Sequence, residues 1–362
     1  MKLSVSIIML ALALALAPKA SAQAKAEHAR PAEKAAEVRH EGADSAIERR
    51  ADAEKSVVVS LCVSSGNVIV RGGDRAEVLA RASEAGSLRL LTPNVQPAPR
   101  VEVVVSEEHD AELSSGDCGS VGTLELTVPR GASVNIQTQG DGHIEVADVA
   151  GLRVQSLSGD VDVRRVSKSV DVNSLSGDIS LTDSSGPARV GTVSGNVEAR
   201  NVRASAAGDS FEAKTVSGDV TLEGITHAQV RGTATSGDIL YRGALAHGGD
   251  YDFKTTSGDL SLELPANSSF SLHAKVVLNG DIITDFPVKV SAGSAASAPP
   301  GVPPRPPNGP AGMPPPPPDA RSAARNRPPR ELPGTRLDGT VGTGDAVVNL
   351  TSFSGSLYLR KQ

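Results

Sequence analysis

The amino-acid sequence predicts an all-β protein, a single-chain parallel β-solenoid (β-helix) of short strands with about 18–23 residues in each coil. Three observations support this prediction. A Ser-Gly-Asp tripeptide recurs along the middle of the chain, short segments of alternating apolar and polar residues flank each copy, and the units between copies are too short for crossover helices. The copies are Ser158-Gly159-Asp160, Ser176-Gly177-Asp178, Ser194-Gly195-Asn196, Ser217-Gly218-Asp219, Ser236-Gly237-Asp238, Ser257-Gly258-Asp259 and Asn279-Gly280-Asp281.

Each tripeptide opens a short strand with one buried face. The residue after the Asp or Asn is always Val, Ile or Leu, the next is mostly polar and the third is mostly apolar, as in Val161-Asp162-Val163. A second short strand precedes each tripeptide, as at 170–172. A coil therefore consists of a strand, the Ser-Gly-Asp turn, a strand and a second turn. Successive coils should pair about 4.8 Å apart, so that equivalent residues stack in columns.

The N-terminal residues are predicted to direct export. Residues 1–22 combine Lys2, an apolar run over 5–17 and small residues before a cleavage point, which is typical of a secretory signal peptide. Residues 23–55 are rich in Ala and charged residues and predict a flexible leader. The solenoid is expected over 56–290, starting with the degenerate turn at 64–67. We expect the mature chain in the periplasm or at the cell surface.

A proline-rich segment interrupts the strand pattern before its end. Residues 291–334 predict a disordered insertion of polyproline type. Residues 335–362 again show the residue pattern of strands and predict a final solenoid coil. The insertion can be a tolerated surface loop or a recognition segment. A role in recognition is suggested by the local positive charge of the insertion, which comes from Arg305, Arg321, Arg325, Arg327 and Arg330.

The two cysteines, Cys62 and Cys118, are predicted to form a structural disulfide. An even number of cysteines in an exported chain favours this pairing, because that compartment is oxidising. In the chain-entropy picture, closing a loop of this length stabilises the fold by about 4 kcal/mol.

Composition argues against several kinds of partner. The formal net charge of −6 disfavours nucleic acid, which is bound by clustered cations. No segment of the mature chain approaches the roughly 20 apolar residues of a membrane helix. Aromatic residues make up 2% of the chain, without a tryptophan, which disfavours a sugar-binding cleft and predicts a narrow aliphatic interior. We expect a monomer whose partner is an envelope or extracellular protein or polysaccharide.

The column of acidic turn residues has two interpretations. Carboxylates stacked about 4.8 Å apart repel by about 0.9 kcal/mol per pair. We therefore expect another interaction of these side chains to offset the repulsion. Calcium bridging between coils is one possibility. The favoured interpretation is structural: the Ser and Asp side chains bond nearby backbone N–H groups while Gly adopts a positive φ. The residues concerned are Gly159, Asp160, Gly177, Asp178, Gly195, Asn196, Gly218, Asp219, Gly237, Asp238, Gly258, Asp259, Gly280 and Asp281.

No catalytic, cofactor-binding or metal-binding residue is predicted. The histidines show no metal-ligand spacing, and no G-x-S-x-G elbow occurs. Asp162 and Glu198 form the one candidate carboxylate pair of a glycoside hydrolase. Stacking would place them two coils and about 10 Å apart, beyond a retaining pair and at the limit of an inverting pair.

A family resemblance is carried by the ordered tripeptides, the segment 264–270, Asn279-Gly280-Asp281-Ile282 with 285–287, and the ending Ser354-Gly355-Ser356-Leu357. In these features the chain resembles the bacterial putative-adhesin family, a domain of unknown function. The resemblance covers 56–362 apart from the proline-rich segment. It implies an exported or envelope-associated solenoid and brings no catalytic or ligand residues. The expected function is that of a non-catalytic, adhesin-like interaction or structural protein. The alternatives are a carbohydrate-active β-helix enzyme (lyase or hydrolase) and a calcium-binding scaffold.

Overall fold

The computed structural model describes residues 46–108, 114–290 and 334–362. The predicted signal peptide and, apart from Gly334, the predicted proline-rich insertion lie outside these residues. Every regular element within them is a β-strand. It follows that this part of the chain contains no helix that could cross a membrane.

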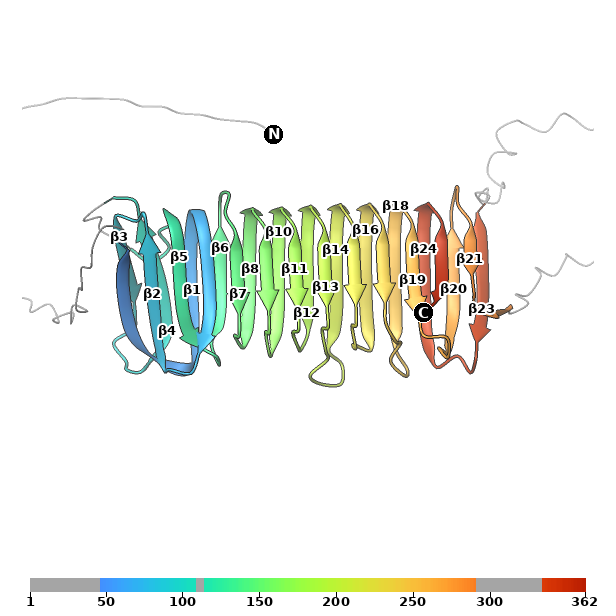
Figure 1. The fold of residues 1–362 in the computed structure, drawn as a ribbon, viewed down its shortest axis with the longest axis horizontal. Coiled ribbons are helices and arrows are strands. Elements are labelled where there is room, and N and C mark those ends of the chain that lie inside the picture. Colours follow the sequence, from blue (N-terminus) through green and yellow to red (C-terminus); the bar gives the residue numbers. More distant parts are fainter. Residues whose placement is uncertain (1–45, 109–113, 291–333) are drawn as a thin grey trace, which may run out of the picture. The chain divides into compact units, whose positions relative to one another are not determined.

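The strands form two rows, one on each side of a common core (Figure 1). The long-strand row pairs in parallel in the order β6 (Ser133–Thr138), β8 (Gly151–Ser158), β10 (Ser169–Ser176), β12 (Ala188–Ser194), β14 (Ser210–Ser217), β16 (Gln229–Ser236) and β18 (Asp250–Ser257). The short-strand row pairs in the order β7 (Ile144–Ala147), β9 (Val161–Arg164), β11 (Ile179–Thr182), β13 (Val197–Arg200), β15 (Val220–Glu223), β17 (Ile239–Arg242) and β19 (Leu260–Leu264). Each coil gives one strand to each row, so the predicted all-β parallel solenoid is confirmed.

The first strand in sequence does not lie at the end of the stack. β1 (Ile47–Gly73) bends at Gly66, so that its first half pairs with β6 and its second half with β7. Its other side pairs with β4 (Ala98–Ser106) and β5 (Gly119–Pro129). The coil made by β1 is therefore inserted between two later ones. The antiparallel strands β2 (Glu77–Ser83) and β3 (Ser87–Leu91) pair with this end of the sheet.

The leader predicted for 23–55 ends earlier than expected, because β1 already begins at Ile47. The charged residues of this segment suggested a solvated chain. They are strand residues, and the start of β1 pairs antiparallel with β2. Arg81 on β2 donates to the Glu48 carboxylate at 2.7 Å, which joins the two strands on their outer side.

The last coil in sequence is also inserted. It consists of β24 (Ala346–Ser354) and β25 (Leu357–Lys361), which lie between the β18/β19 coil and the coil of β20 (Phe270–Val276) and β21 (Ile282–Thr284). β23 (Thr335–Val341) pairs antiparallel with β20, and β22 (Lys289–Val290) pairs with β23. The sequence predicts coils that stack in chain order, and both ends depart from it.

The core is a set of inward columns of aliphatic side chains that also accommodates aromatic rings. Six of the eight Phe and Tyr residues are buried, a larger share than the expected aliphatic interior suggests: Phe211, Tyr241, Tyr251, Phe253, Phe270 and Phe286. A coil next to a large ring can hold a small residue that leaves space for the ring. Gly232 stacks on Phe253, and a Cβ at Gly232 would lie 2.7 Å from the Phe253 ring. A small residue in one coil therefore makes room for a ring in the next, which keeps the interior filled.

Candidate functional site

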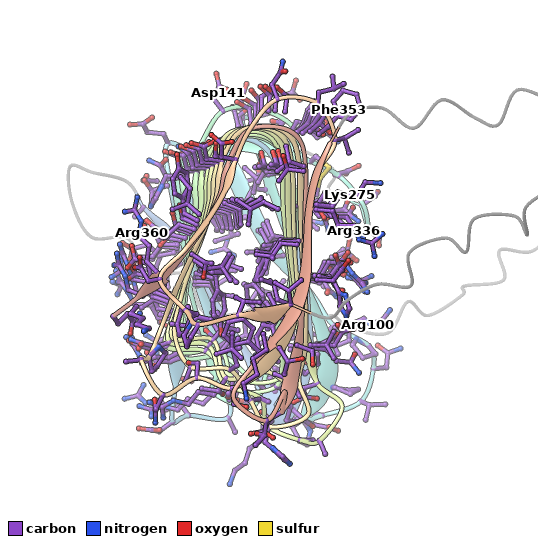
Figure 2. All side chains as sticks on the ribbon, turned by 90° about the vertical axis from the view of Figure 1, so that its right-hand side faces the viewer. Arg100, Asp141, Lys275, Arg336, Phe353 and Arg360 are labelled. Atoms are coloured by element: carbon purple, nitrogen blue, oxygen red, sulfur yellow. A yellow bond between two sulfur atoms is a disulfide. The ribbon has the colours of Figure 1, made fainter. Side chains whose placement is uncertain are left out.

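The Ser-Gly-Asp turns line up on one edge of the solenoid, where the long-strand row passes into the short-strand row. We call this line the corner edge: the four consecutive residues 157–160 and their equivalents in the other coils. End on, Figure 2 shows Asp141 and Phe353 at this same end of the coil cross-section. Because pairing is parallel and in register, each of the four positions forms a column along the edge.

The glycine column is required by backbone geometry. Gly195 has a φ of 144°, and a Cβ there would lie 2.2 Å from the carbonyl oxygen of Gly177 in the preceding coil. Gly218 shows the same arrangement against Gly195, at 2.0 Å. A side chain at this position would meet both a disfavoured backbone conformation and the stacked neighbour. The close approach keeps consecutive corners in contact.

The acidic column is a hydrogen-bonded ladder, which we call the acidic ladder. The Oδ1 atom of Asp160 accepts the backbone N–H of Asp178 at 2.9 Å, and Oδ1 of Asp178 accepts the N–H of Asn196 at 2.7 Å. Asn196, Asp219 and Asp238 accept in the same way from the next coil, at 2.9, 2.8 and 2.7 Å. These side chains bond the neighbouring coil, whereas the sequence suggested bonds to nearby backbone of their own turn. Asn196 fits because an amide oxygen accepts as a carboxylate does.

The inserted last coil takes part in the same ladder. The N–H of Ser356 donates to Asp259 Oδ1 at 2.7 Å, and the N–H of Asp281 donates to Ser356 Oγ at 3.2 Å. The glycines follow the same order, since Cβ atoms at Gly355 and Gly280 would meet the carbonyl oxygens of Gly258 and Gly355. The tripeptide Ser354-Gly355-Ser356 therefore occupies a rung between two earlier turns.

Sequence analysis missed a buried hydroxyl column beneath the corner edge. Ser174 donates to the carbonyl oxygen of Ser176 at 3.0 Å, and Thr215 donates to that of Gly195 at 3.0 Å. The position lies two residues before each turn Ser and holds a hydroxyl in most coils: Ser156, Ser174, Thr192, Thr215, Thr255 and Ser352. Aligning the residues that precede the tripeptides, and not only those that follow them, would have found this column.

The ladder carboxylates lack cationic partners in the described part of the chain. Among the described residues, no ion pair involves Asp160, Asp178, Asp219, Asp238 or Asp259. Acids on the sheet faces differ. Hydrogen bonds from Lys214 and Arg189 hold the pKa of Glu212 below its usual range, and a hydrogen bond from Arg242 does the same for Glu263. The corner edge is thus an uncompensated line of negative charge.

Within the described ranges, no group of three or more His, Cys, Asp and Glu side chains is arranged to hold a metal ion. In the ladder, the Oδ1 atoms that could have bridged a cation accept backbone N–H groups instead. The ladder geometry fits hydrogen-bond acceptance between coils.

The structure does not bring the candidate glycosidase acids together. Asp162 lies 3.3 Å from His143, and Glu198 forms an ion pair with Arg200. Both lie on the outer side of the short-strand row, with Ser180 between them. Each acid has its own local partner.

The remaining histidines do not gather at one site. His227 is fully buried, and desolvation lowers its pKa. His273 pairs with Asp338 at 2.9 Å on the outer surface. His28, His40 and His109 lie outside the described residues.

The disulfide lies in the N-terminal coils of the stack, where Gln139 donates to Cys118 Sγ at 3.6 Å. Cys62 on β1 is joined to Cys118, which directly precedes β5, with Cα atoms 4.7 Å apart. A cavity of about 290 Å³ lies at the turn 204–209 and is lined by small side chains and Asp209. One carboxylate among Ala, Gly, Ser and Thr does not make an acid–base pair.

Fold and site together define a parallel β-solenoid whose turns repeat one chemical pattern along an exposed edge. Residues 59–294 match the Toastrack DUF4097 family, and the chain belongs to that family. No curated protein matches the chain.

Three solved structures resemble it distantly. A putative adhesin of Parabacteroides merdae is 10% identical, with a TM-score of 0.35, over 61% of this chain and 89% of the other. A putative lipid binding protein of Parabacteroides distasonis is 12% identical, with a TM-score of 0.34, over 60% and 89%. A putative cell adhesion protein of Clostridium sporogenes is 8% identical, with a TM-score of 0.19, over 88% and 100%.

Proposed function

We propose that this protein is an exported, non-catalytic interaction protein of the cell envelope, monomeric, and that the corner edge is its contact surface. The observation that carries the proposal is the edge itself, an exposed line on which the same groups recur from coil to coil and have no ion-pair partner within residues 46–108, 114–290 and 334–362. Repetition at constant spacing suits a partner that is contacted at many equivalent points.

Two further features support this function. The disulfide between Cys62 and Cys118 is of the kind that persists in oxidising compartments, which agrees with the signal sequence predicted for 1–22. The burial of six of the eight aromatic rings removes them from the stacking surfaces that carbohydrate-active sites use. The ladder Oδ1 atoms are already used to join the coils, because each accepts a backbone N–H of the next coil.

Cell fractionation tests the proposal. We expect the chain without residues 1–22 in the envelope fraction, with both cysteines protected from alkylation until reductant is added. Protease treatment of intact cells then separates a surface position from a periplasmic one. A full-length chain in the cytoplasm with two alkylated thiols would overturn export, and a processed chain free in the soluble fractions would overturn envelope interaction.

A further inference from the structure

A line of exposed aliphatic side chains runs beside the acidic ladder. We call it the aliphatic stripe: Leu157, Leu175, Val193 and Val216, with exposed fractions of 50%, 51%, 44% and 45%. These residues immediately precede the turn Ser in four consecutive coils. The register of β8, β10, β12 and β14 places them opposite one another. They therefore form one continuous line.

The fold does not require aliphatic residues at this position. The next two coils have Thr235 and Thr256 there, in the same register and with the same turn. Another outward position of the long-strand row holds charges of alternating sign: Arg189, Glu212, Arg231 and Asp252. Single exposed aliphatic residues are ordinary, but an uninterrupted line of them indicates a contact surface.

The stripe and the ladder form one composite surface. In each coil the aliphatic residue is followed by Ser, Gly and then Asp or Asn, so that only small residues separate the two lines. Oδ1 of each ladder side chain accepts from the next coil, and Oδ2 of Asp160, Asp178 and Asp219 has no hydrogen-bond partner among the described residues. A ligand meets an apolar line and a negative line side by side.

Two possible occupants fit this surface poorly. A line one side chain wide, over four coils about 4.8 Å apart, is far smaller than the roughly 800 Å² that each partner buries in a standard protein interface, so a stable dimer of this chain is disfavoured. An anionic lipid surface would be repelled by the adjacent carboxylates.

A cationic amphipathic helix fits both lines. Its turns repeat every 5.4 Å or so, close to the coil spacing, whereas same-face residues of an extended strand lie about 6.8 Å apart. About three turns would span the four coils of the stripe. Aliphatic residues at i, i+3 and i+4 would pack on Leu157, Leu175, Val193 and Val216, while neighbouring Lys or Arg would reach the free Oδ2 atoms.

We propose that the aliphatic stripe and the acidic ladder together bind a cationic amphipathic helix of a protein partner. This inference rests on the proposed function, because it names the partner class of the same corner edge. It is tested with purified protein in solution, so it can fail while export and envelope association hold.

The direct test is a fluorescence anisotropy titration with a labelled 14-residue peptide of Leu and Lys, with Leu at helical spacing. A peptide with Glu in place of every Lys is the charge control, and a scrambled Leu/Lys peptide of equal composition is the pattern control. We expect saturable binding of the first peptide and at least about tenfold weaker binding of both controls.

The chain offers conservative variants for each half of the surface. Changing Leu157, Leu175, Val193 and Val216 to Thr follows the example of Thr235 and should leave the coils folded. Replacing Asp160, Asp178 and Asp219 by Asn follows the example of Asn196 and keeps the Oδ1 acceptors. Each variant should lower the affinity about tenfold without lowering the temperature of thermal unfolding.

A charge-matched control separates a specific surface from general attraction to an acidic protein. Asp52, Glu107 and Glu125 are exposed acids without ion pairs among the described residues, and their change to Asn, Gln and Gln removes the same net charge. This control should bind the Leu/Lys peptide as the native chain does.

Four outcomes would overturn the proposal: no binding of the Leu/Lys peptide at millimolar concentration, equal binding of the scrambled or Glu peptide, loss of affinity in the charge-matched control equal to that in the ladder variant, or undiminished affinity in the Thr variant. Two companion measurements cover other occupants. Sedimentation with phosphatidylcholine vesicles that is lost in the Thr variant would assign the stripe to a lipid surface. A dimer in analytical ultracentrifugation that the Thr variant abolishes would assign it to a second copy.

Discussion

Single residues of the corner turn have separate tasks. Gly195 supplies a positive φ and lets the carbonyl of Gly177 approach, Asp178 supplies an acceptor for the next coil, and Thr215 covers the Gly195 carbonyl from the interior. The turn is therefore a stacking device in which each residue contacts the coil beside it. Its exposed atoms remain available to a ligand.

Substituting Gly195 by Ala should destabilise the protein by about 2–4 kcal/mol, because a positive φ and a steric clash act together. The Cβ would lie 2.2 Å from the Gly177 carbonyl oxygen. Urea unfolding measures the change. Gly191→Ala is the matched control, because the nearest atom to its Cβ lies at 3.6 Å and its φ is not positive. Equal destabilisation by both variants would contradict the role given to the turn glycine.

His227 should make stability depend on pH. Its Nε2 must carry the proton donated to the Gly186 carbonyl at 2.9 Å, and its Nδ1 has no hydrogen-bond partner in the part of the chain that the structure describes. Burial lowers its pKa below the ordinary 6.5. As the pH falls through about 6.5, the unfolded chain takes up a proton that the folded chain does not, so stability is highest above that pH and is lost below it.

Thermal unfolding at about pH 7.5 and about pH 5.5 checks this assignment. The change from His227 to Gln retains an N–H donor and removes the titrating group. The variant should lose less stability on acidification than the native chain. An identical loss in both proteins would assign the pH dependence to other groups.

At the scale of elements, alternating charges across neighbouring strands hold the register of the rows. Arg200, Glu223, Arg242, Glu263 and Arg360 face one another along the short-strand row. Arg242 donates to Glu223 and Glu263 at 2.7 Å each. A slip of one coil would oppose like charges, so the alternation favours one stacking order over its neighbours.

Replacing Arg242 by Glu should destabilise the protein by about 1 kcal/mol, because three acids would then be adjacent on neighbouring strands. Arg164→Glu is the control, since its cross-strand neighbours Ala147 and Thr182 are uncharged. Chemical denaturation of both variants, repeated at high salt, measures the difference. The destabilisation of the Arg242 variant should shrink with salt, and a salt-independent effect would point to lost packing instead.

The strands and turns of the coils could be predicted from the sequence, because most positions of the repeat hold residues of one kind with one structural role. The Val, Ile or Leu after each turn and the alternation that follows it predict strands, faces and register. The coil order at the two ends could not be predicted, because Ser354-Gly355-Ser356 also supplies a turn glycine and a side-chain oxygen acceptor, and nothing in its sequence says between which two coils it stacks. The hydrogen bonds that Asp side chains accept from the next coil were missed for a related reason. A carboxylate beside a turn can accept an N–H either of its own turn or of the stacked turn in the next coil.

For the molecule as a whole, the insertion of the last coil makes the C-terminal strands part of the stack. β20 pairs with β23 and β24, and β21 pairs with β25. The segment 270–284 therefore depends on residues that follow the proline-rich segment. Strands distant in sequence close this end of the sheet.

A chain that ends at Gly334 should lose protection in 270–284 and keep it in β8 to β16. Hydrogen exchange followed by mass spectrometry resolves the two regions. Exchange in 270–284 should rise to the rate of an unstructured segment. Unchanged protection there would mean that β20 and β21 can pair directly with β18 and β19, contrary to the inserted order.

The corner turn stacks the coils through acceptor atoms and leaves its charge free for interaction. The most direct measurement is the thermal unfolding of a variant with Asn at every aspartate of the ladder, compared with a variant that has Ala at the same positions: Asp160, Asp178, Asp219, Asp238 and Asp259. We predict that the Asn variant melts at or above the temperature of the native chain, because the acceptors remain and the repulsion is gone. The Ala variant should lose about 1 kcal/mol for each acceptor removed. Equal destabilisation of both variants would contradict the claim, because it would show that the carboxylate charge itself holds the coils together.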